Sequence, residues 1–328
     1  MSPSGVTAGR IPRGASAAIA APLRPRSGQP LAAPGHACCV GHRGARAYAP
    51  ENTLAAFAKA AAMGCTMVEL DVHLSRDGAV VVHHDDRLGR CTDVKARFPA
   101  RSTDFVSDYT VAELQALDAG SWYVRQLALP AAQRQGFLQT LSEAELSRWV
   151  SPEDQALYAS GSVRIPTLAA TLAQARELDL VVNIEIKALP RMYPGIARAV
   201  VADVAAAGMQ RSVLVSSFDH EQLLEVKQLD PTLLTGVLTS DRLARPADYL
   251  QLLAADAYHP GCYDDFDSLG FNSVSARLDA RGIAAVRAAG RMVFAWTCNH
   301  SAQMQALAAA GVTGVMTDYP NRFGLALP

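Results

Sequence analysis

Two histidines stand at the ends of short β-type segments, where side chains from separate parts of a chain can meet. His42 ends the first such segment and His84 ends the third. Because imidazoles titrate near neutral pH, one can deprotonate a nucleophile while the other protonates a leaving group. Each histidine alone could equally be structural. As a pair beside several carboxylates, they predict acid–base catalysis, and hydrolysis of a phosphodiester fits that chemistry.

Three acidic residues predict a metal site beside the histidines. Glu69 and Asp71 are two residues apart on one expected strand, so they share a face and would repel unless a cation or proton lay between them. Glu185, on a later strand, could supply a third oxygen. Such a set suits one divalent ion, Ca²⁺ or Mg²⁺, and not zinc. The alternative is a salt bridge to Arg43 or Lys187, which would otherwise stabilise phosphoryl oxygens.

A hairpin decides which of two neighbouring histidines faces the acidic residues. The second and third segments are joined by a connection that is too short for a parallel crossover. It contains Asp77 and Gly78, a favoured two-residue turn. If these two residues form the turn, Asp71 lies opposite His84, and opposed residues project to the same face. This register favours His84 over His83 as the catalytic residue, and a bulge would reverse the choice.

The elements that must position these residues follow a regular alternation. From residue 38 onward, short β-branched runs alternate with Ala- and Leu-rich amphipathic segments, which is typical of βα units around a parallel sheet. Nine runs are candidate strands, whereas a closed barrel of this kind has eight. The third run returns antiparallel in the hairpin, which leaves eight runs for the barrel. We therefore predict an α/β protein, a (β/α)8 TIM barrel with a β-hairpin after strand 2. Asn52 and Gly64 are expected to cap and end the first helix. The expected strands are 39–42, 67–72, 80–84, 181–186, 213–217, 234–239, 254–259, 292–297 and 312–317.

The chain divides into a tail, 1–36, and one catalytic domain, 37–328. The tail is rich in Ala, Pro, Gly, Ser and Arg and has no acidic residue. We expect disorder there and a cytoplasmic protein. The alternative is an export signal, because two arginines precede a short, weakly apolar stretch. Between about 118 and 165 lies a segment that fits no βα unit. We predict an insertion over the barrel mouth, either a substrate-selecting lid or a structural excursion.

Composition narrows the expected partners. A net charge of -1 argues against broad binding to nucleic acid or to an anionic membrane, so phosphate recognition must be local. No apolar run approaches the roughly 18 residues of a spanning helix. The six cysteines form no CxxC pair, which favours buried, reduced thiols. We expect a small-molecule phosphodiester as the partner, with no nucleic acid and no stable membrane insertion. The oligomeric state stays open.

The motifs of the chain, taken in order, resemble a known family. They are Gly41-His42-Arg43-Gly44, Pro50-Glu51-Asn52-Thr53, Glu69-Leu70-Asp71-Val72, His84-Asp85 followed by Arg90 and Thr92, Leu117-Asp118-Ala119-Gly120-Ser121-Trp122, Ile165-Pro166-Thr167-Leu168, Ile184-Glu185-Ile186-Lys187, Ser216-Ser217-Phe218, Trp296-Thr297 with Asn299, and Thr317-Asp318-Tyr319-Pro320. This set is similar to the glycerophosphodiester phosphodiesterase family. Two features depart from the family pattern, namely the long insertion and the extra His83.

The resemblance implies a role for each candidate residue within a (β/α)8 barrel. Glu51 would support the site. Trp296 is similar to an aromatic that lines the mouth, and a buried core tryptophan is the alternative. The remaining implied roles are acid–base catalysis by His42 and His84, metal ligation by Glu69, Asp71 and Glu185, and phosphate contact by Arg43 and Lys187.

The reaction implied by the resemblance is hydrolysis of a glycerophosphodiester to sn-glycerol 3-phosphate and an alcohol, a step of lipid and glycerol metabolism. The nucleophile is either the substrate's own glycerol hydroxyl, through a cyclic phosphate, or water. One alternative is a lysophospholipase D-type enzyme whose insertion accommodates an acyl chain. Another is a catalytically inactive barrel that binds phosphodiesters. Retention of both histidines and all three carboxylates speaks against the inactive barrel.

Overall fold

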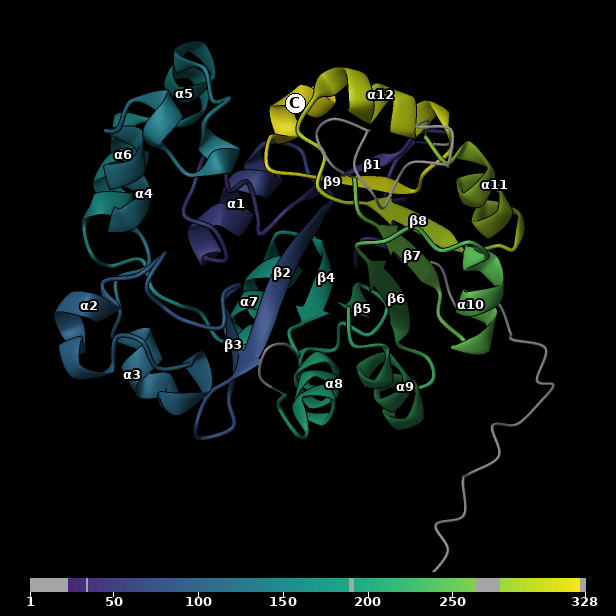
Figure 1. Ribbon diagram of the computed structural model, residues 1–328, viewed down its shortest axis with the longest axis horizontal. Coiled ribbons are helices and arrows are strands. Elements are labelled where there is room, and N and C mark those ends of the chain that lie inside the picture. Colours follow the sequence, from purple (N-terminus) through teal and green to yellow (C-terminus); the bar gives the residue numbers. More distant parts are fainter. Residues whose placement is uncertain (1–22, 34, 189–191, 263–277, 325–328) are drawn as a thin grey trace, which may run out of the picture.

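The computed structural model describes residues 23–33, 35–188, 192–262 and 278–324. Across these residues nine strands form one sheet in the order β1-β9-β8-β7-β6-β5-β4-β2-β3, and β1 also pairs with β2 (Figure 1). Eight parallel strands therefore close into a ring, and β3 lies outside it, antiparallel to β2. The predicted (β/α)8 barrel with a hairpin after the second strand is confirmed. The strands are β1 (Cys38–Gly41), β2 (Met67–Leu74), β3 (Val80–Val82), β4 (Val181–Ile186), β5 (Val213–Ser217), β6 (Leu234–Thr239), β7 (Ala257–Pro260), β8 (Met292–Ala295) and β9 (Gly314–Thr317).

Helices surround the barrel and connect successive parallel strands (Figure 1). The connecting helices are α1 (Leu54–Ala62), α7 (Leu168–Glu177), α8 (Ile196–Ala207), α9 (His220–Leu229), α10 (Pro246–Leu252), α11 (Ala280–Ala288) and α12 (Ser301–Ala309). Two short helices, α2 (Val94–Arg97) and α3 (Val111–Gln115), follow the hairpin, and the 3-10 turn Pro320–Phe323 follows β9. No helix in the described ranges is long and apolar enough to span a bilayer.

The barrel interior is an apolar core at the amino end of the strands. Inward-facing side chains from all eight ring strands pack there, and Leu23, from the described part of the predicted tail, packs with them. Residues 1–22 of that tail lie outside the described ranges. All six cysteines are buried and unbridged, as predicted. Because apolar residues fill one end, the polar inward-facing residues are left at the carboxyl end of the strands, where barrel active sites lie.

The hairpin register differs by one residue from the prediction. Val72 pairs with Val82, and the amide of His83 donates to the carbonyl of Asp71 at 3.0 Å, so Asp71 lies opposite His83 and not His84. The turn has three residues, because Gly78 adopts a left-handed φ of 81°. Such loops, a type I turn followed by a left-handed glycine, shift the register relative to a two-residue turn.

The start of the first helix also differs from the prediction. Thr53, not Asn52, caps α1, because its hydroxyl accepts from the amide of Ala56. Asn52 has a positive φ of 55° and points to Asp71, with its Nδ2 donating to Asp71 Oδ2 at 2.8 Å. The helix continues to Ala62, just before the predicted end at Gly64. Because Thr53 caps the helix, the side chain of Asn52 is available to contact Asp71 of the acidic residues.

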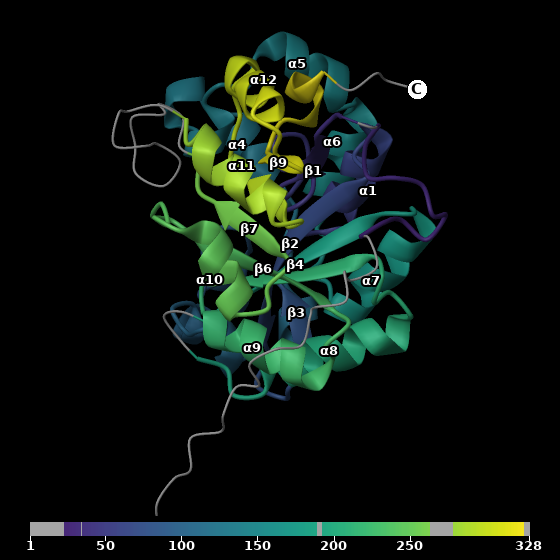
Figure 2. The same ribbon diagram turned by 90° about the vertical axis from the view of Figure 1, so that its right-hand side faces the viewer.

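The segment between about 118 and 165 contains three α-helices, which lie beside α1 and the 3-10 turn Pro320–Phe323 (Figure 2). They are α4 (Ser121–Leu127), α5 (Glu143–Trp149) and α6 (Pro152–Ala159). Ion pairs tie them to the barrel: Lys59 Nζ lies 2.6 Å from Asp154 Oδ2, and Arg322 Nε lies 2.7 Å from Glu145 Oε1. Tyr123 also donates to the carbonyl of Ala47 at 2.6 Å. These contacts hold the segment against the barrel wall.

Candidate active site

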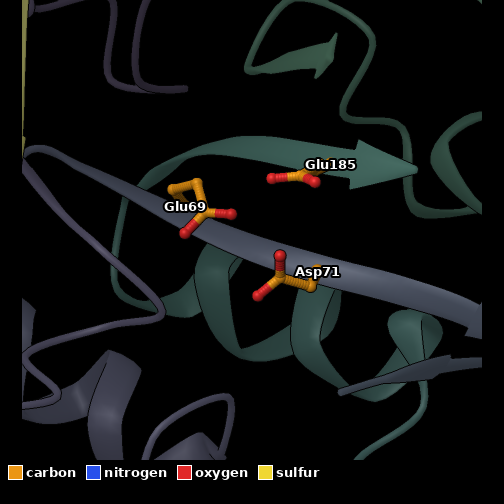
Figure 3. Close-up of side chains that lie close together, drawn as sticks. All are labelled: Glu69, Asp71 and Glu185. Atoms are coloured by element: carbon orange, nitrogen blue, oxygen red, sulfur yellow. The ribbon is translucent and has the colours of Figure 1, made fainter. Parts of the chain in front are cut away.

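Three carboxylates meet at the carboxyl end of the barrel. Glu69 and Asp71 project from β2, and Glu185 projects from the neighbouring β4 toward them (Figure 3). Parallel pairing places Asp71 in register with Glu185. Each side chain offers one oxygen, and these oxygens lie within 4.8 Å of one another. The structure thus brings together the acidic set predicted from the sequence.

The electrostatics of this cluster favour a cation. Burial raises the pKa of Glu69 well above its ordinary value, and the carboxylates of Asp71 and Glu185 raise it further. Burial also raises the pKa of Glu185. Burial acts in the same direction on Asp71, but Lys187 and other neighbouring positive groups outweigh it, so the pKa of Asp71 is lowered. The shifts of Glu69 and Glu185 show that their negative charges lack full compensation from the protein.

The donor set fits a hard divalent ion. Glu69 Oε1 is buried and has no hydrogen-bond partner within the described chain. Lys187 Nζ lies 2.5 Å from Glu185 Oε1 and 2.9 Å from Asp71 Oδ1. Arg43 Nε also lies 3.4 Å from Asp71 Oδ2, but Arg43 is shared with Glu51, so the three carboxylates keep an excess of negative charge that a divalent cation would offset. Oxygen ligands of this kind suit Ca²⁺ or Mg²⁺. The predicted alternative, a salt bridge to Arg43 or Lys187, is present with both residues and leaves negative charge in excess.

His42 is held with one ring nitrogen on a carboxylate and the other toward the acidic cluster. Its Nδ1 lies 2.7 Å from Asp318 Oδ1, and its Nε2 lies 3.8 Å from Glu69 Oε2. Because a carboxylate only accepts, Nδ1 carries the proton and Nε2 is left as the base. Burial, followed by the positive charge of Arg46, lowers the pKa of His42 to about 4. Its imidazole is therefore neutral near pH 7.

His84 is likewise held by an aspartate. Its Nδ1 lies 2.7 Å from Asp85 Oδ1. Burial, then the positive charge of Arg43, lowers its pKa to about 4, and Asp71 partly opposes this effect. His83 instead bonds the carbonyl of Arg87 through Nε2 at 3.3 Å. The predicted register that selected His84 is therefore wrong, because Asp71 lies opposite His83. His84 is nonetheless close enough to Asp71 for the two groups to interact electrostatically.

Arg43 and Glu51 connect the cluster to the surrounding chain. Arg43 has a φ of 53°, and its backbone amide donates to Glu69 Oε2 at 2.9 Å. Its side chain contacts Glu51 Oε1 at 2.9 Å through Nη1 and lies 3.4 Å from Asp71 Oδ2 through Nε. Glu51 also accepts two hydrogen bonds from Arg90, at 2.7 and 3.0 Å. Arg43 therefore borders the acidic oxygens, and Glu51 lies behind it.

A pocket of about 260 Å³ opens beside His42. Its walls include Asp318, which contacts His42, and Phe137, from the segment between α4 and α5. Trp296 is also in the wall, where its ring packs edge-to-face on Phe218 at 5.4 Å and its Nε1 donates to the carbonyl of His259 at 2.8 Å. The indole is partly exposed in this wall and also packs against the apolar core of the barrel.

Several residues of the site were given no role from the sequence. Asp318 and Asp85 bind the two histidines, Arg46 binds Asp318, and Asn52 binds Asp71. The two aspartates each follow a strand end, which is the signal that could have singled them out. Arg46 and Asn52 act through long-range contacts that no local pattern shows.

Comparison with known proteins assigns this arrangement to a family. Residues 42–322 match the model of the Glycerophosphoryl diester phosphodiesterase family. The chain belongs to this family. The resemblance seen in the sequence is confirmed, and members of the family are phosphoric diester hydrolases, so the protein is an enzyme of that class.

Two relatives and one solved structure illustrate the glycerophosphoryl diester phosphodiesterase match. A glycerophosphodiester phosphodiesterase of Caldanaerobacter subterraneus subsp. tengcongensis is 29% identical over 281 residues, which cover 86% of this chain and 93% of the relative. One from Bacillus subtilis is 29% identical over 300 residues, covering 89% and 87%. A phosphodiesterase of Oleispira antarctica, solved with its product sn-glycerol 3-phosphate, superposes with a TM-score of 0.65 at 26% identity, covering 88% of this chain and 96% of the other.

Proposed function

We propose that the protein hydrolyses glycerophosphodiesters to sn-glycerol 3-phosphate and an alcohol, with His42 and His84 as its acid–base pair. The observation that carries the proposal is a pair of imidazoles, each held through Nδ1 by an aspartate, of which His42 lies 3.8 Å from Glu69 and His84 interacts electrostatically with Asp71 of the buried acidic cluster. Family membership and the solved relative bound to sn-glycerol 3-phosphate support the substrate class.

The acidic cluster would hold one divalent ion, Ca²⁺ or Mg²⁺, through Glu69, Asp71 and Glu185. When bound, such an ion supplies Lewis-acid stabilisation of negative charge on a phosphoryl group. Arg43 and Lys187 border the same oxygens, so their positive charges are available to a phosphodiester anion drawn to this end of the barrel. Together these groups would favour an anionic substrate in a protein whose net charge is close to zero.

The two histidines would share the proton transfers. Each is neutral near pH 7, with Nδ1 donating to an aspartate and Nε2 able to take a proton from the attacking hydroxyl. The negative charge of a bound phosphodiester would raise the pKa of a nearby imidazole and so favour the protonated form in the partner that protonates the leaving alkoxide. Either histidine can fill either role, and the attacking group can be the glycerol hydroxyl or water.

Product analysis tests the proposal. The purified protein is incubated with glycerophosphocholine, and sn-glycerol 3-phosphate and choline are both quantified. The same assay follows chelation and restoration of Ca²⁺ or Mg²⁺, and is repeated with His42→Ala and His84→Ala. We expect equal amounts of the two products, loss of turnover on chelation and no turnover in either variant. Release of phosphocholine and glycerol instead would contradict the assigned bond cleavage.

The same assay separates glycerophosphodiesters from lipid-like substrates. Lysophosphatidylcholine carries the same phosphodiester with an added acyl chain. We expect faster turnover of glycerophosphocholine. Faster turnover of the lysolipid would replace the proposed substrate class with a lysophospholipase D-type activity, whereas binding of both compounds without turnover would indicate an inactive barrel.

A further inference from the structure

One chain of ion pairs joins the two histidines around the acidic cluster. From His42 it passes through Asp318 to Arg46, whose Nε and Nη2 contact the two oxygens of that carboxylate at 2.5 and 3.0 Å. From His84 it passes through Asp85 to Arg90. Both arginines then meet at Glu51. Positive and negative groups alternate along the whole path, and each histidine sits at one end of it.

Arg90 uses its full set of donors in this chain. Its Nε and Nη2 contact the two oxygens of Asp85 at 2.7 and 2.8 Å, and its two terminal nitrogens contact Glu51 at 2.7 and 3.0 Å. The fifth N–H, on Nη1, donates to Gln135 Oε1 at 3.0 Å. A guanidinium has five N–H donors in a rigid plane, so these contacts fix its orientation. Gln135 is the one neutral partner among them.

Arg46 is held on one edge and on one face. Its edge contacts Asp318, and its Nη1 lies 3.7 Å from Glu51 Oε2, an ion-pair distance beyond hydrogen bonding. Its Cζ lies 4.3 Å above the ring of Phe137. Stacking on an aromatic face restrains the guanidinium plane and is attractive for a cation. Phe137 therefore supports Arg46 where the ion pairing to Glu51 is weakest.

Gln135 and Phe137 both come from the inserted segment between α4 and α5, and this stretch is firmly held. The amide of Gln135 donates to Gln126 Oε1 at 2.7 Å. The carbonyl of Phe137 accepts from the hydroxyl of Tyr319 at 2.5 Å, and Tyr319 is the residue after Asp318. The segment thus contacts both arginines from a fixed position.

We propose that Gln135 and Phe137 are positioning residues for the two acid–base histidines, Gln135 acting on His84 through Arg90 and Phe137 acting on His42 through Arg46. The proposal rests on the assigned roles of the histidines. It gives the insertion a function that does not require it to move or to touch the substrate. A misplacement of a reacting group by about 1 Å can cost about a hundredfold in rate, so partial loosening of one arginine is expected to lower kcat about tenfold with little change in KM.

Matched variants test each arm of the chain. Gln135→Leu removes the acceptor for Arg90 and keeps the size of the side chain. Phe137→Leu removes the ring beneath Arg46. Gln139→Leu is the control, because Gln139 lies in the same segment, is exposed, and its side chain makes a hydrogen bond only to the carbonyl of Arg134 among the described residues. Thermal melting identifies any variant that fails to fold.

Two readouts are combined, and one does not depend on turnover. Proton–nitrogen correlation spectra of the histidine rings, assigned with His42→Asn and His84→Asn, report which ring nitrogen carries the proton. We expect Gln135→Leu to change the His84 ring signals and leave those of His42, and Phe137→Leu to do the reverse. In steady-state assays each variant should lose about tenfold in kcat while Gln139→Leu stays at the wild-type rate.

The outcomes separate this inference from the proposed function. Unchanged ring signals in both variants, or changes no different from those of Gln139→Leu, would overturn the positioning role even if the wild type hydrolyses glycerophosphodiesters. Selective ring changes support the positioning role whatever the substrate. A wild type that hydrolyses no diester would contradict the proposed function and leave the ring-signal result to decide the inference.

Discussion

Replacing Asp318 with asparagine isolates the contribution of the carboxylate that holds His42. The carboxylate accepts from His42 Nδ1 at 2.7 Å and also binds Arg46 and Asn299. An amide can donate through Nδ2, so Asp318→Asn can reverse the tautomer and place the proton on Nε2, where the base is needed. His42 would then be present in the wrong protonation state for its role.

The expected loss in rate follows from the share that acid–base catalysis contributes. Positioned proton transfer contributes typically about 10²–10⁴-fold, so we expect kcat to fall by about 10²–10³, equivalent to about 3–4 kcal/mol in the barrier. KM should change little, because Asp318, although it lies in the pocket wall, is fully buried and its carboxylate is bound by His42, Arg46 and Asn299. Steady-state kinetics on glycerophosphocholine and the ring spectrum of His42 measure the two consequences.

A matched control distinguishes lost catalysis from lost stability. Asp256 lies just before β7, at the opposite end of the barrel, with its carboxylate 2.7 Å from Lys227 Nζ and 3.8 Å from Arg291 Nη1. Asp256→Asn removes a comparable ion-paired carboxylate and should lower the melting temperature without lowering kcat. If Asp318→Asn keeps the wild-type kcat, or if both variants lose activity in proportion to their stability, the reasoning about His42 is wrong.

Three further predictions follow from local contacts. His84→Ala should abolish turnover and His83→Ala should be mild, because His83 bonds only a backbone carbonyl in the described chain; comparison of their kcat values checks this. Thr53→Ala removes the cap of α1 and should cost about 1 kcal/mol in the free energy of unfolding, measured by denaturant titration. Partial burial acts to raise the pKa of Glu145, but hydrogen bonds from Arg322 prevail and lower it to about 2, below the ordinary 4.5. The ion pair of Glu145 with Arg322 therefore stabilises the fold above about pH 4.5, and this stabilisation is lost as the pH falls toward about 2. Glu145→Gln should lower the melting temperature by about 2 °C at neutral pH, a value reduced because the partly exposed pair is screened by solvent. In acid the same substitution should lower the melting temperature by less.

The strands could be predicted because their signals are local. The expected ranges 181–186, 213–217 and 234–239 coincide with β4, β5 and β6. Runs of β-branched residues bounded by polar ends leave little freedom when both faces are buried. The acidic cluster followed from the same logic, because Glu69 and Asp71 are on one strand and adjacent parallel strands end together.

The hairpin register and the helix cap needed information that is not in the local pattern. Asp-Gly allows both two- and three-residue turns, and the choice here depends on Ser75, whose hydroxyl accepts from the amide of Ala79 at 2.9 Å and donates to Asp77 at 2.7 Å. Asn52 does not cap α1, because its side chain instead donates a hydrogen bond to Asp71, which is distant in the sequence. Capping rules alone rank Asn and Thr almost equally.

The chain of ion pairs could not have been predicted from the sequence. Asp318 lies 276 residues from His42, and Gln135 lies 45 residues from Arg90. Only the closure of the barrel and the docking of the insertion bring them together. The sequence left the insertion as either a lid or a structural excursion, and its contacts with both arginines support a third role.

Metal binding measured on the metal-free protein tests the central claim most directly. Isothermal titration with Ca²⁺ and with Mg²⁺ should show one ion bound per chain, with affinity greatly reduced in Glu69→Gln and in Asp71→Asn, and the bound ion should restore turnover. Binding that is unaffected by both substitutions, or full activity after every divalent ion has been removed, would contradict the account.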